Sequence, residues 1–172
     1  ALFTALIVAG AYIRIPVGPV PIVLANLFVI LAGLLLPLKW AVSSVALYLL
    51  LGGIGLPVFA QGSGLAYFSG PTGGYLLGYL PAVAATALIS SKKRLLIWRE
   101  VVASVAGVLI IYAVGVPWLR TALDMSWSQS LASGMIPFLP GDAAKVVLAV
   151  LVTVSIRKGY PELLPPSKHS AT

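Results

Sequence analysis

The stretch LGGIGLPVFAQGSGLAYFSGPTGGYLLGYLP (residues 51–81) is rich in glycine and contains no charged side chain. Its glycines and prolines predict turns and irregular backbone. A loop this apolar is not expected in water, whereas non-helical backbone at membrane depth is tolerated where protein buries it or where it lines a cavity. We therefore predict that residues 57–73 form an apolar loop that folds back into the extracellular mouth of a membrane-embedded bundle.

The composition of the whole chain also indicates a membrane protein. Of its 172 residues, 60% are hydrophobic and 9% are charged, whereas roughly a quarter of the residues in a soluble domain are charged. A spanning helix takes about 20 apolar residues, and fewer when protein shields it, so this length accommodates about six spans. The sequence predicts one membrane domain over residues 1–172. Because the chain begins inside an apolar run, a truncated N-terminus is one interpretation.

Apolar runs bounded by proline, glycine and charge are the candidate spans. They cover about residues 1–13, 22–38, 40–56, 74–91, 99–116 and 141–157. The predicted fold is therefore an all-α integral membrane protein with six transmembrane helices. The apolar re-entrant loop lies between the third and fourth of them.

The orientation follows from Lys and Arg in short loops, which are biased toward the cytoplasm. The basic residues of one side are Lys39, Lys92, Lys93, Arg94, Arg99, Arg157, Lys158 and Lys168, and those of the other side are Arg14 and Arg120. This distribution requires an even number of crossings with both termini in the cytoplasm. Residues 159–172 are then a cytoplasmic tail.

Several function classes are excluded by what the chain lacks. The net charge of +7 does not form the continuous basic stripe that nucleic acid requires. The chain has four acidic residues, one histidine and no cysteine. Glu100 adjoins a basic loop, Asp124 lies in a polar loop and Glu162 lies in the tail. The chain therefore cannot supply a catalytic pair or a metal site. No GxxxxGK[ST] loop is present, so we expect neither an enzyme nor an ATPase.

The segment FLPGDAAKVVLAV (residues 138–150) carries the most informative charges. Pro140 and Gly141 precede the last span, which places Asp142 in its first turn, where the helix dipole favours a carboxylate. Asp142 and Lys145 share a face at i and i+3. One interpretation is a helix cap with a local ion pair; the other is a ligand site facing the bundle interior. A carboxylate accepts N–H groups of a urea-like or amide group, and an ammonium binds an acid or a carbonyl.

Further candidate ligand-binding residues are polar side chains in or near the spans. Each has an ordinary structural alternative: an interhelical hydrogen bond for the amide, core packing for the tyrosines, and backbone turns for the loop residues. The candidates are Asn26, Tyr48, Tyr75, and Gln61, Thr72 and Gly73 of the apolar loop.

A small-residue pattern marks the first run. Ala1, Ala5 and Ala9 repeat at i+4, so they lie on one face of the first helix. Small residues at this spacing allow another helix to approach closely. The neighbour is either a helix of this bundle or a helix of a partner.

Several of these segments together resemble the BioY family, the substrate-binding S components of energy-coupling-factor (ECF) biotin transporters. The similar segments cover roughly half of the chain, in family order. They are AYIRIPVGPVPI (11–22), LFVILAGLLL (27–36), YLLLGGIGLPVFAQGSGLAYFSGPTGGYLLGY (48–79) and PGDAAKVVLA (140–149).

The resemblance implies six helices around a vitamin pocket near the outer surface, gated by the loop between the first and second helices. In this chain the lid would comprise Arg14, Ile15, Pro16, Val17, Gly18 and Pro19, continuing to Pro21. The Asp and Lys of the family's G-D-x-x-K motif fall on Asp142 and Lys145 and are expected to contact biotin, which offers a ureido group and a carboxylate on an apolar body. Which end each residue meets is left open.

The resemblance also implies partners and a location. The face of Ala1, Ala5 and Ala9 is expected to meet a transmembrane coupling subunit, and two cytoplasmic ATPase subunits would hydrolyse the ATP. No cofactor is implied for this chain, and the expected location is the plasma membrane of a prokaryote.

One departure from the family pattern concerns the ligand. Many relatives carry glutamine and threonine after P-[IV]-x-L, where this chain has Ala25 and Asn26. A different ligand, another small vitamin or a lipoate-like acid, is therefore one alternative to biotin. A structural membrane subunit without a ligand, in which PGDAAK is only a helix cap, is a second.

Overall fold

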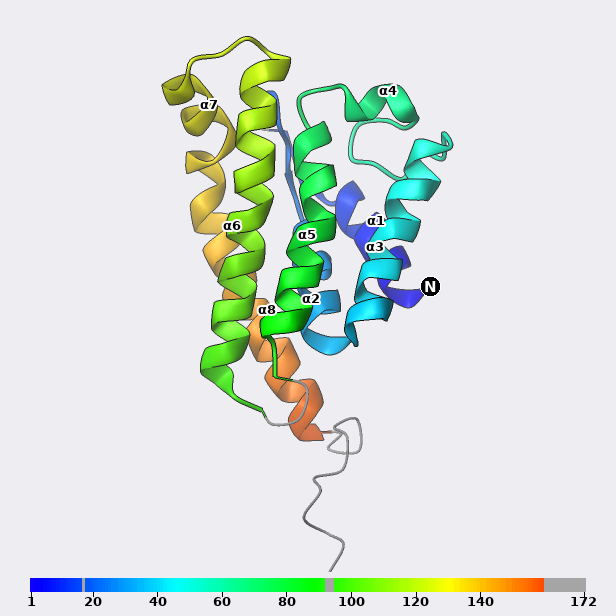
Figure 1. Cartoon of the computed structure of the whole chain (residues 1–172), viewed down its shortest axis with the longest axis vertical. Helices are drawn as coiled ribbons and strands as arrows, with labels where there is room; N and C mark the ends of the chain where they lie inside the picture. The colour runs from blue at the N-terminus through cyan, green and yellow to red at the C-terminus, as the bar shows by residue number, and fades with distance from the viewer. Residues whose placement is uncertain (17, 92–94, 160–172) are drawn as a thin grey trace, which may run out of the picture.

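The computed structural model describes residues 1–16, 18–91 and 95–159. The expectations for Val17, for the basic residues 92–94 and for the tail from residue 160 onward fall outside the described residues. Within the described residues the chain is mainly helical, and Figure 1 shows the helices packed side by side along the long axis of the molecule.

Each predicted apolar run overlaps one of the longer helices, and α6 extends furthest beyond its run. These are α1 (Leu2–Tyr12), α2 (Ala25–Leu35), α3 (Leu38–Gly53), α5 (Gly73–Ile89), α6 (Ile97–Ala122) and α8 (Leu139–Gly159). Two helical stretches, 97–122 and 127–159, are long and apolar enough to cross a membrane, whereas α1, α2, α3 and α5 are shorter apolar helices of 10–17 residues. The helical character of the six runs is confirmed.

Five short elements among the described residues were not predicted from the sequence. They are strands β1 (Arg14–Ile15) and β2 (Ile22–Val23) and helices α4 (Leu65–Phe68) and α7 (Trp127–Gly134), and the 3-10 helix η1 (Ile136–Phe138) then leads into α8. The strands form an antiparallel hairpin, with Arg14 opposite Val23. A capping box formed by Ser126 and Gln129 begins α7, and this S-x-x-Q pattern is readable in a sequence.

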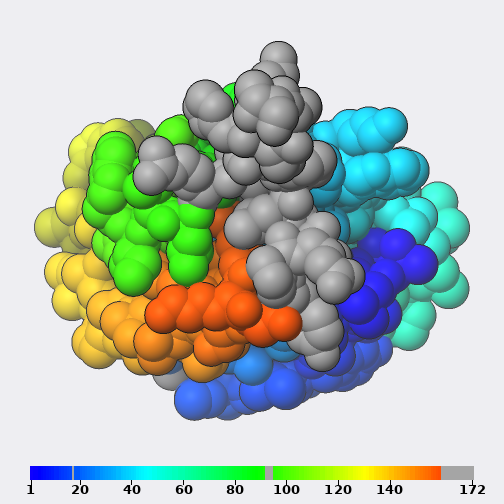
Figure 2. All heavy atoms as spheres, turned by 90° about the horizontal axis from the view of Figure 1, so that it is seen from below, coloured from blue at the N-terminus to red at the C-terminus, as the bar shows by residue number. Residues whose placement is uncertain are grey.

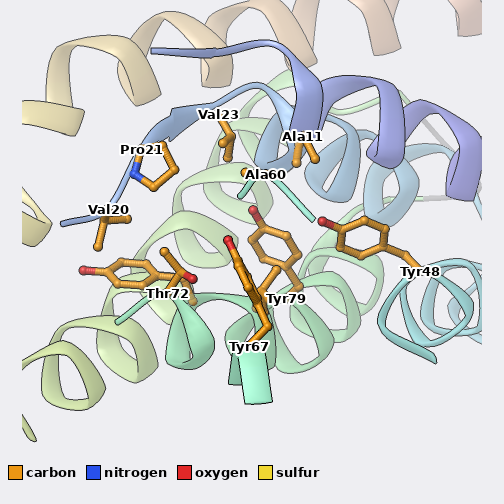
Figure 3. Close-up of a pocket in the computed structure, with 12 residues that line it drawn as sticks. Ala11, Val20, Pro21, Val23, Tyr48, Ala60, Tyr67, Thr72 and Tyr79 are labelled. Atoms are coloured by element: carbon orange, nitrogen blue, oxygen red, sulfur yellow. The ribbon is translucent and has the colours of Figure 1, made fainter. Parts of the chain in front are cut away.

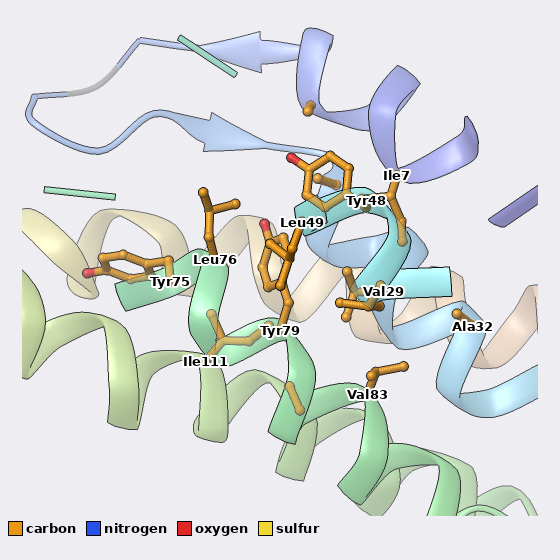
Figure 4. Close-up of a cluster of buried hydrophobic side chains, with 14 of the residues drawn as sticks. Ile7, Val29, Ala32, Tyr48, Leu49, Tyr75, Leu76, Tyr79, Val83 and Ile111 are labelled. Carbon is orange, nitrogen blue, oxygen red and sulfur yellow. The ribbon is translucent and has the colours of Figure 1, made fainter. Parts of the chain in front are cut away.

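Helix α5 occupies the centre of the bundle and contributes to the largest apolar cluster. Figure 4 shows its Tyr75, Leu76, Tyr79 and Val83 beside residues of α1, α2, α3 and α6. Two small residues of α5 permit the close approach of α6: a Cβ on Gly74 would collide with Trp118, and one on Gly78 would press on the backbone of Ile111. Small residues at such spacing allow this packing between apolar helices, where burial from water contributes little.

The apolar segment 57–73 folds back against the end of α3. Phe59 is 2% exposed, and its ring meets Tyr48 edge-on at 5.4 Å and stacks on Tyr67 at 5.1 Å. Gly52 leaves the space that the ring fills, since any Cβ there would overlap it. The backbone N–H of Gly64 donates to the Gly52 carbonyl at 2.7 Å. This segment is not wholly irregular, because it contains α4.

A buried ion pair joins the helices at the other end of the bundle. The Arg157 guanidinium lies 2.9 Å from Glu100 Oε1, and it also donates to the Ser91 carbonyl at 2.7 Å and to the Leu34 carbonyl. Ser90 Oγ donates to Glu100 Oε2 at 2.6 Å. The sequence analysis placed Glu100 and Arg157 beside basic loops and did not predict their burial. Together these contacts connect α2, α5, α6 and α8, and Figure 2 views the bundle from this end.

Replacing Arg157 with leucine should lower the free energy of unfolding by about 3–5 kcal/mol, because the Glu100 carboxylate then stays buried without its charged partner. The measurement is the midpoint of thermal unfolding of the detergent-purified protein. Lys158→Leu, at the exposed neighbouring position, is the matched control. Equal midpoints for the two variants would contradict the role assigned to the buried pair.

Candidate functional site

Two adjoining cavities open between the helices near the β1–β2 hairpin. The space between their walls, open mouth included, is about 370 Å³ in one and about 400 Å³ in the other. They are neighbours because they share the wall residues Val20, Pro21, Val23, Tyr75 and Tyr79. We call the first the aromatic cavity and the second the ion-pair cavity.

The predicted Asp142–Lys145 pair is formed, and it lines the ion-pair cavity. Helix α8 begins at Leu139, so Asp142 lies in its first turn, where the helix dipole favours a negative charge. Lys145 Nζ lies 2.9 Å from Asp142 Oδ1, and both side chains are largely buried, at 13% and 7% exposure.

Two other helices bring donors to the same carboxylate. Asn26 Nδ2 of α2 donates to Asp142 Oδ1 at 2.9 Å, and the Tyr112 hydroxyl of α6 donates to Oδ2. An ionised carboxylate only accepts hydrogen bonds, so the NH₂ end of the Asn26 amide must face it. The Asn26 carbonyl oxygen is buried and has no hydrogen-bond partner among the described residues.

The β1–β2 hairpin covers both cavities through its returning strand. Val20, Pro21 and Val23 belong to the wall of each cavity, and Lys145 Nζ donates to the Val23 carbonyl at 2.8 Å. Of the predicted lid residues, Arg14, Ile15, Pro16 and Gly18 are exposed and Pro19 is half-buried. Of the predicted lid, only Val20 and Pro21 at its end line the cavities.

The aromatic cavity is lined mainly by tyrosines and small apolar side chains. Figure 3 shows Tyr48 of α3, Tyr67 of α4 and Tyr79 of α5 around it, with Thr72 at its edge. Tyr75 lines both cavities, but its hydroxyl donates to the Gly134 carbonyl at 2.8 Å. Tyr75 therefore turns only its ring to the cavities, and the predicted site residues Tyr48 and Thr72 line the aromatic cavity.

Two predicted site residues line neither cavity. Gln61 is exposed. Gly73 is buried at the start of α5 against the carbonyl of Phe68, where a Cβ would overlap that carbonyl. Its structural role is close packing of the turn before α5. These two expectations find no support in the geometry of the cavities.

The sequence analysis missed three tyrosines of the cavity walls, Tyr67, Tyr79 and Tyr112. Tyr79 follows Tyr75 at i+4 on α5, and this spacing could have placed both rings on one face. Tyr112 lies within an apolar run of α6, and no local pattern distinguishes it from a packed core residue. Its contact with Asp142 joins positions 30 residues apart.

The predicted alanine face is exposed. Ala1, Ala5 and Ala9 lie on the outer side of the N-terminal helical segment, whereas Thr4, Ile7 and Ala11 of α1 are buried in the bundle. Within the described residues, the small residues thus do not pack against another helix.

Comparisons with known proteins agree with this architecture. The chain is 42% identical over 158 residues to the biotin transporter BioY of Thermotoga maritima, covering 91% of this chain and 92% of that protein. It is 40% identical over 153 residues to a probable biotin transporter BioY of Pyrococcus horikoshii, covering 88% and 90%.

A solved structure shares the fold of this chain. The crystal structure of the S-component for biotin from an ECF-type ABC transporter superposes with a TM-score of 0.84 at 33% identity, covering 92% of this chain and 88% of that chain. The model of the BioY family matches residues 1–162. The chain therefore belongs to the BioY family.

Proposed function

We propose that this protein binds biotin and mediates its uptake as the S component of an ECF-type transporter. The observation that carries the proposal is the Asp142–Lys145 pair, buried in a cavity and bound by Asn26 and Tyr112. The names of the relatives, biotin transporters and a biotin S-component, support the ligand. The chain is a transporter component and not an enzyme.

The charge of the pair supports one orientation of the ligand. Asp142 and Lys145 neutralise each other, so a ligand carboxylate placed beside them would be repelled by Asp142 without a free cation to offset it. A ureido group is neutral and offers both N–H donors and a carbonyl. An ionised carboxylate has about four acceptor sites and an ammonium has three donors. Asp142 can therefore accept, and Lys145 can donate, a further hydrogen bond beyond those described above. The ureido end of biotin therefore fits the ion-pair cavity.

The uptake cycle assigns different tasks to this chain and its partners. Biotin enters from outside, and the β1–β2 hairpin closes over it, with Lys145 holding the returning strand through the Val23 carbonyl. The exposed alanine face of α1 docks on a transmembrane coupling subunit. Two cytoplasmic ATPase subunits supply the energy, because this chain has no nucleotide-binding loop.

The membrane topology completes the proposal. The six longer helices cross the plasma membrane of a prokaryote with both termini in the cytoplasm, and the apolar segment 57–73 re-enters the membrane from outside. The start of α3, the start of α6 and the end of α8 lie at the lower end of the bundle in Figure 1. These helix ends carry Lys39, Arg99 and Lys158. Because basic residues favour the cytoplasmic side, this end faces the cytoplasm and the cavities face outward.

A lipoate-like acid is the second candidate ligand, and Ala25 favours it. Ala25 lines the aromatic cavity, where many relatives carry a glutamine, so this chain lacks a side-chain amide at that point. Asn26 favours biotin because it brings an amide to Asp142 one position later. Competition of lipoate against biotin decides between the two ligands.

Asp142→Asn should weaken biotin binding by about 2–5 kcal/mol, equal to roughly 30-fold or more in Kd, because the variant leaves Lys145 without its partner in a buried site. Lys145→Ala should act in the same direction. Calorimetric titration of the detergent-purified proteins with biotin and with lipoate measures both effects. Exposed Asp124 provides the matched control, Asp124→Asn. Unchanged biotin affinity in Asp142→Asn would refute the role of the pair, and no thermal shift with any vitamin would favour a structural subunit.

Ala5→Trp should abolish biotin uptake by the complete transporter and leave biotin affinity of the purified protein unchanged, because a large side chain prevents close approach of a partner helix. Ala113→Trp, at an exposed position of α6, is the control and should transport normally. Equal uptake by the two variants would show that the alanine face is not the docking surface.

The topology can be tested by cysteine labelling, since the chain has no cysteine of its own. A membrane-impermeant maleimide should label Asp124→Cys in intact cells and Lys39→Cys only after lysis. The connection between α6 and α7, which carries Asp124, and the start of α3, which carries Lys39, lie at opposite ends of the bundle (Figure 1). The reverse pattern would invert the proposed orientation.

A further inference from the structure

We propose that the hydroxyls of Tyr48, Tyr67 and Tyr79 form a carboxylate-binding subsite in the aromatic cavity. We call these three residues the tyrosine triad. The inference rests on the proposed function, since it assigns the second polar end of the same ligand. It places the carboxylate of the ligand away from the Asp142–Lys145 pair.

The triad gathers in one place although its members come from three helices. Tyr48 belongs to α3, Tyr67 to α4 and Tyr79 to α5, and all three line the aromatic cavity. The rings of Tyr48 and Tyr79 lie 6.5 Å apart between centroids. Figure 3 shows the three hydroxyls directed toward the same space, beneath Ala60 and the returning strand of the hairpin.

The three hydroxyls have no hydrogen-bond partner in the part of the chain that the structure describes. This distinguishes them from Tyr75 and Tyr112, whose hydroxyls donate to Gly134 and Asp142. The Tyr48 and Tyr79 side chains are packed in the bundle, at 1% and 4% exposure, and Tyr67 is half-buried. Their hydroxyl oxygens open onto the aromatic cavity, since none of them is among the fully buried side-chain atoms without a partner. Three free donors directed into one cavity are placed to bind a polar group of a ligand.

Aromatic contacts hold the triad in position. The Phe59 ring meets Tyr48 edge-on at 5.4 Å and stacks on Tyr67 at 5.1 Å, and Phe59 is itself fixed between Gly52 and Phe68. The hydroxyls are thus placed before any ligand arrives. Preorganised donors bind more tightly because less conformational freedom is lost on binding.

A carboxylate is the group that fits three hydroxyl donors in this cavity. Bonds from O–H to an ionised oxygen are roughly twice as strong as neutral ones. The rest of the wall is mostly apolar, and neither an acidic nor a basic side chain lines it. Asp142, which would repel a second carboxylate, lines only the neighbouring cavity. The shared wall of Val20, Pro21 and Val23 then covers the apolar body between the two ends of the ligand.

The test compares biotin with its methyl ester, which keeps the ureido ring and removes the carboxylate charge. The double variant Tyr48→Phe with Tyr79→Phe keeps both rings and removes two donors. It should weaken biotin binding by about tenfold or more, because bonds to charged groups are the strong ones. Its affinity for the methyl ester should stay within about twofold of the wild type, because neutral bonds contribute little net. Thermal unfolding of the variant checks that it is folded.

Two controls separate this inference from the proposed function. Tyr12→Phe removes a hydroxyl that binds the Pro57 carbonyl and lines neither cavity, so it should not alter the preference for biotin over the ester. Asp142→Asn should weaken both ligands. Suppose that Asp142→Asn weakens the binding of both ligands, whereas the double variant weakens the binding of biotin and of the ester equally, or of neither. The triad is then not a carboxylate subsite, and the proposed function stands. If neither ligand responds to Asp142→Asn, the proposed function fails.

Discussion

The Asp142 carboxylate is the group on which the geometry of the site depends, because a charge inside an apolar bundle is stable only with a counter-charge and donors around it. Lys145 supplies the charge from the next turn of α8, while Asn26 and Tyr112 bring α2 and α6 to the same group. The pocket therefore exists only when these three helices are packed. Since Lys145 also binds the Val23 carbonyl, the position of the hairpin depends on the same pair.

The same constraint acts at the opposite end of α8. Arg157 in its last turn is buried with Glu100 of α6, and their remaining donors and acceptors meet backbone groups and Ser90. One helix thus carries a buried charge near each end, with apolar packing in between. The Glu100–Arg157 pair fixes the arrangement of α2, α5, α6 and α8, and that arrangement holds the Asp142–Lys145 pair in place at the ion-pair cavity.

Most of the fold could be predicted from local patterns, and its exceptions have physical causes. Apolar runs between charges and prolines located the six longer helices. Strands of two residues are too short to show an alternating pattern, so β1 and β2 left no signal. Helix α6 continues to Ala122 although Pro117 lies inside it, because apolar packing outweighs the hydrogen bond that proline removes. Helix α7 could have been predicted from its capping box.

The sequence by itself determined that the chain is a helical membrane protein, and it identified the Asp142–Lys145 pair, because composition and i, i+3 spacing are local properties. The tertiary structure alone decided which distant groups meet. Arg157 reaches Glu100 across 57 positions, Tyr112 reaches Asp142, and the triad hydroxyls converge from α3, α4 and α5. Such contacts depend on the rotation and packing of each helix against the others, which no short stretch of sequence encodes.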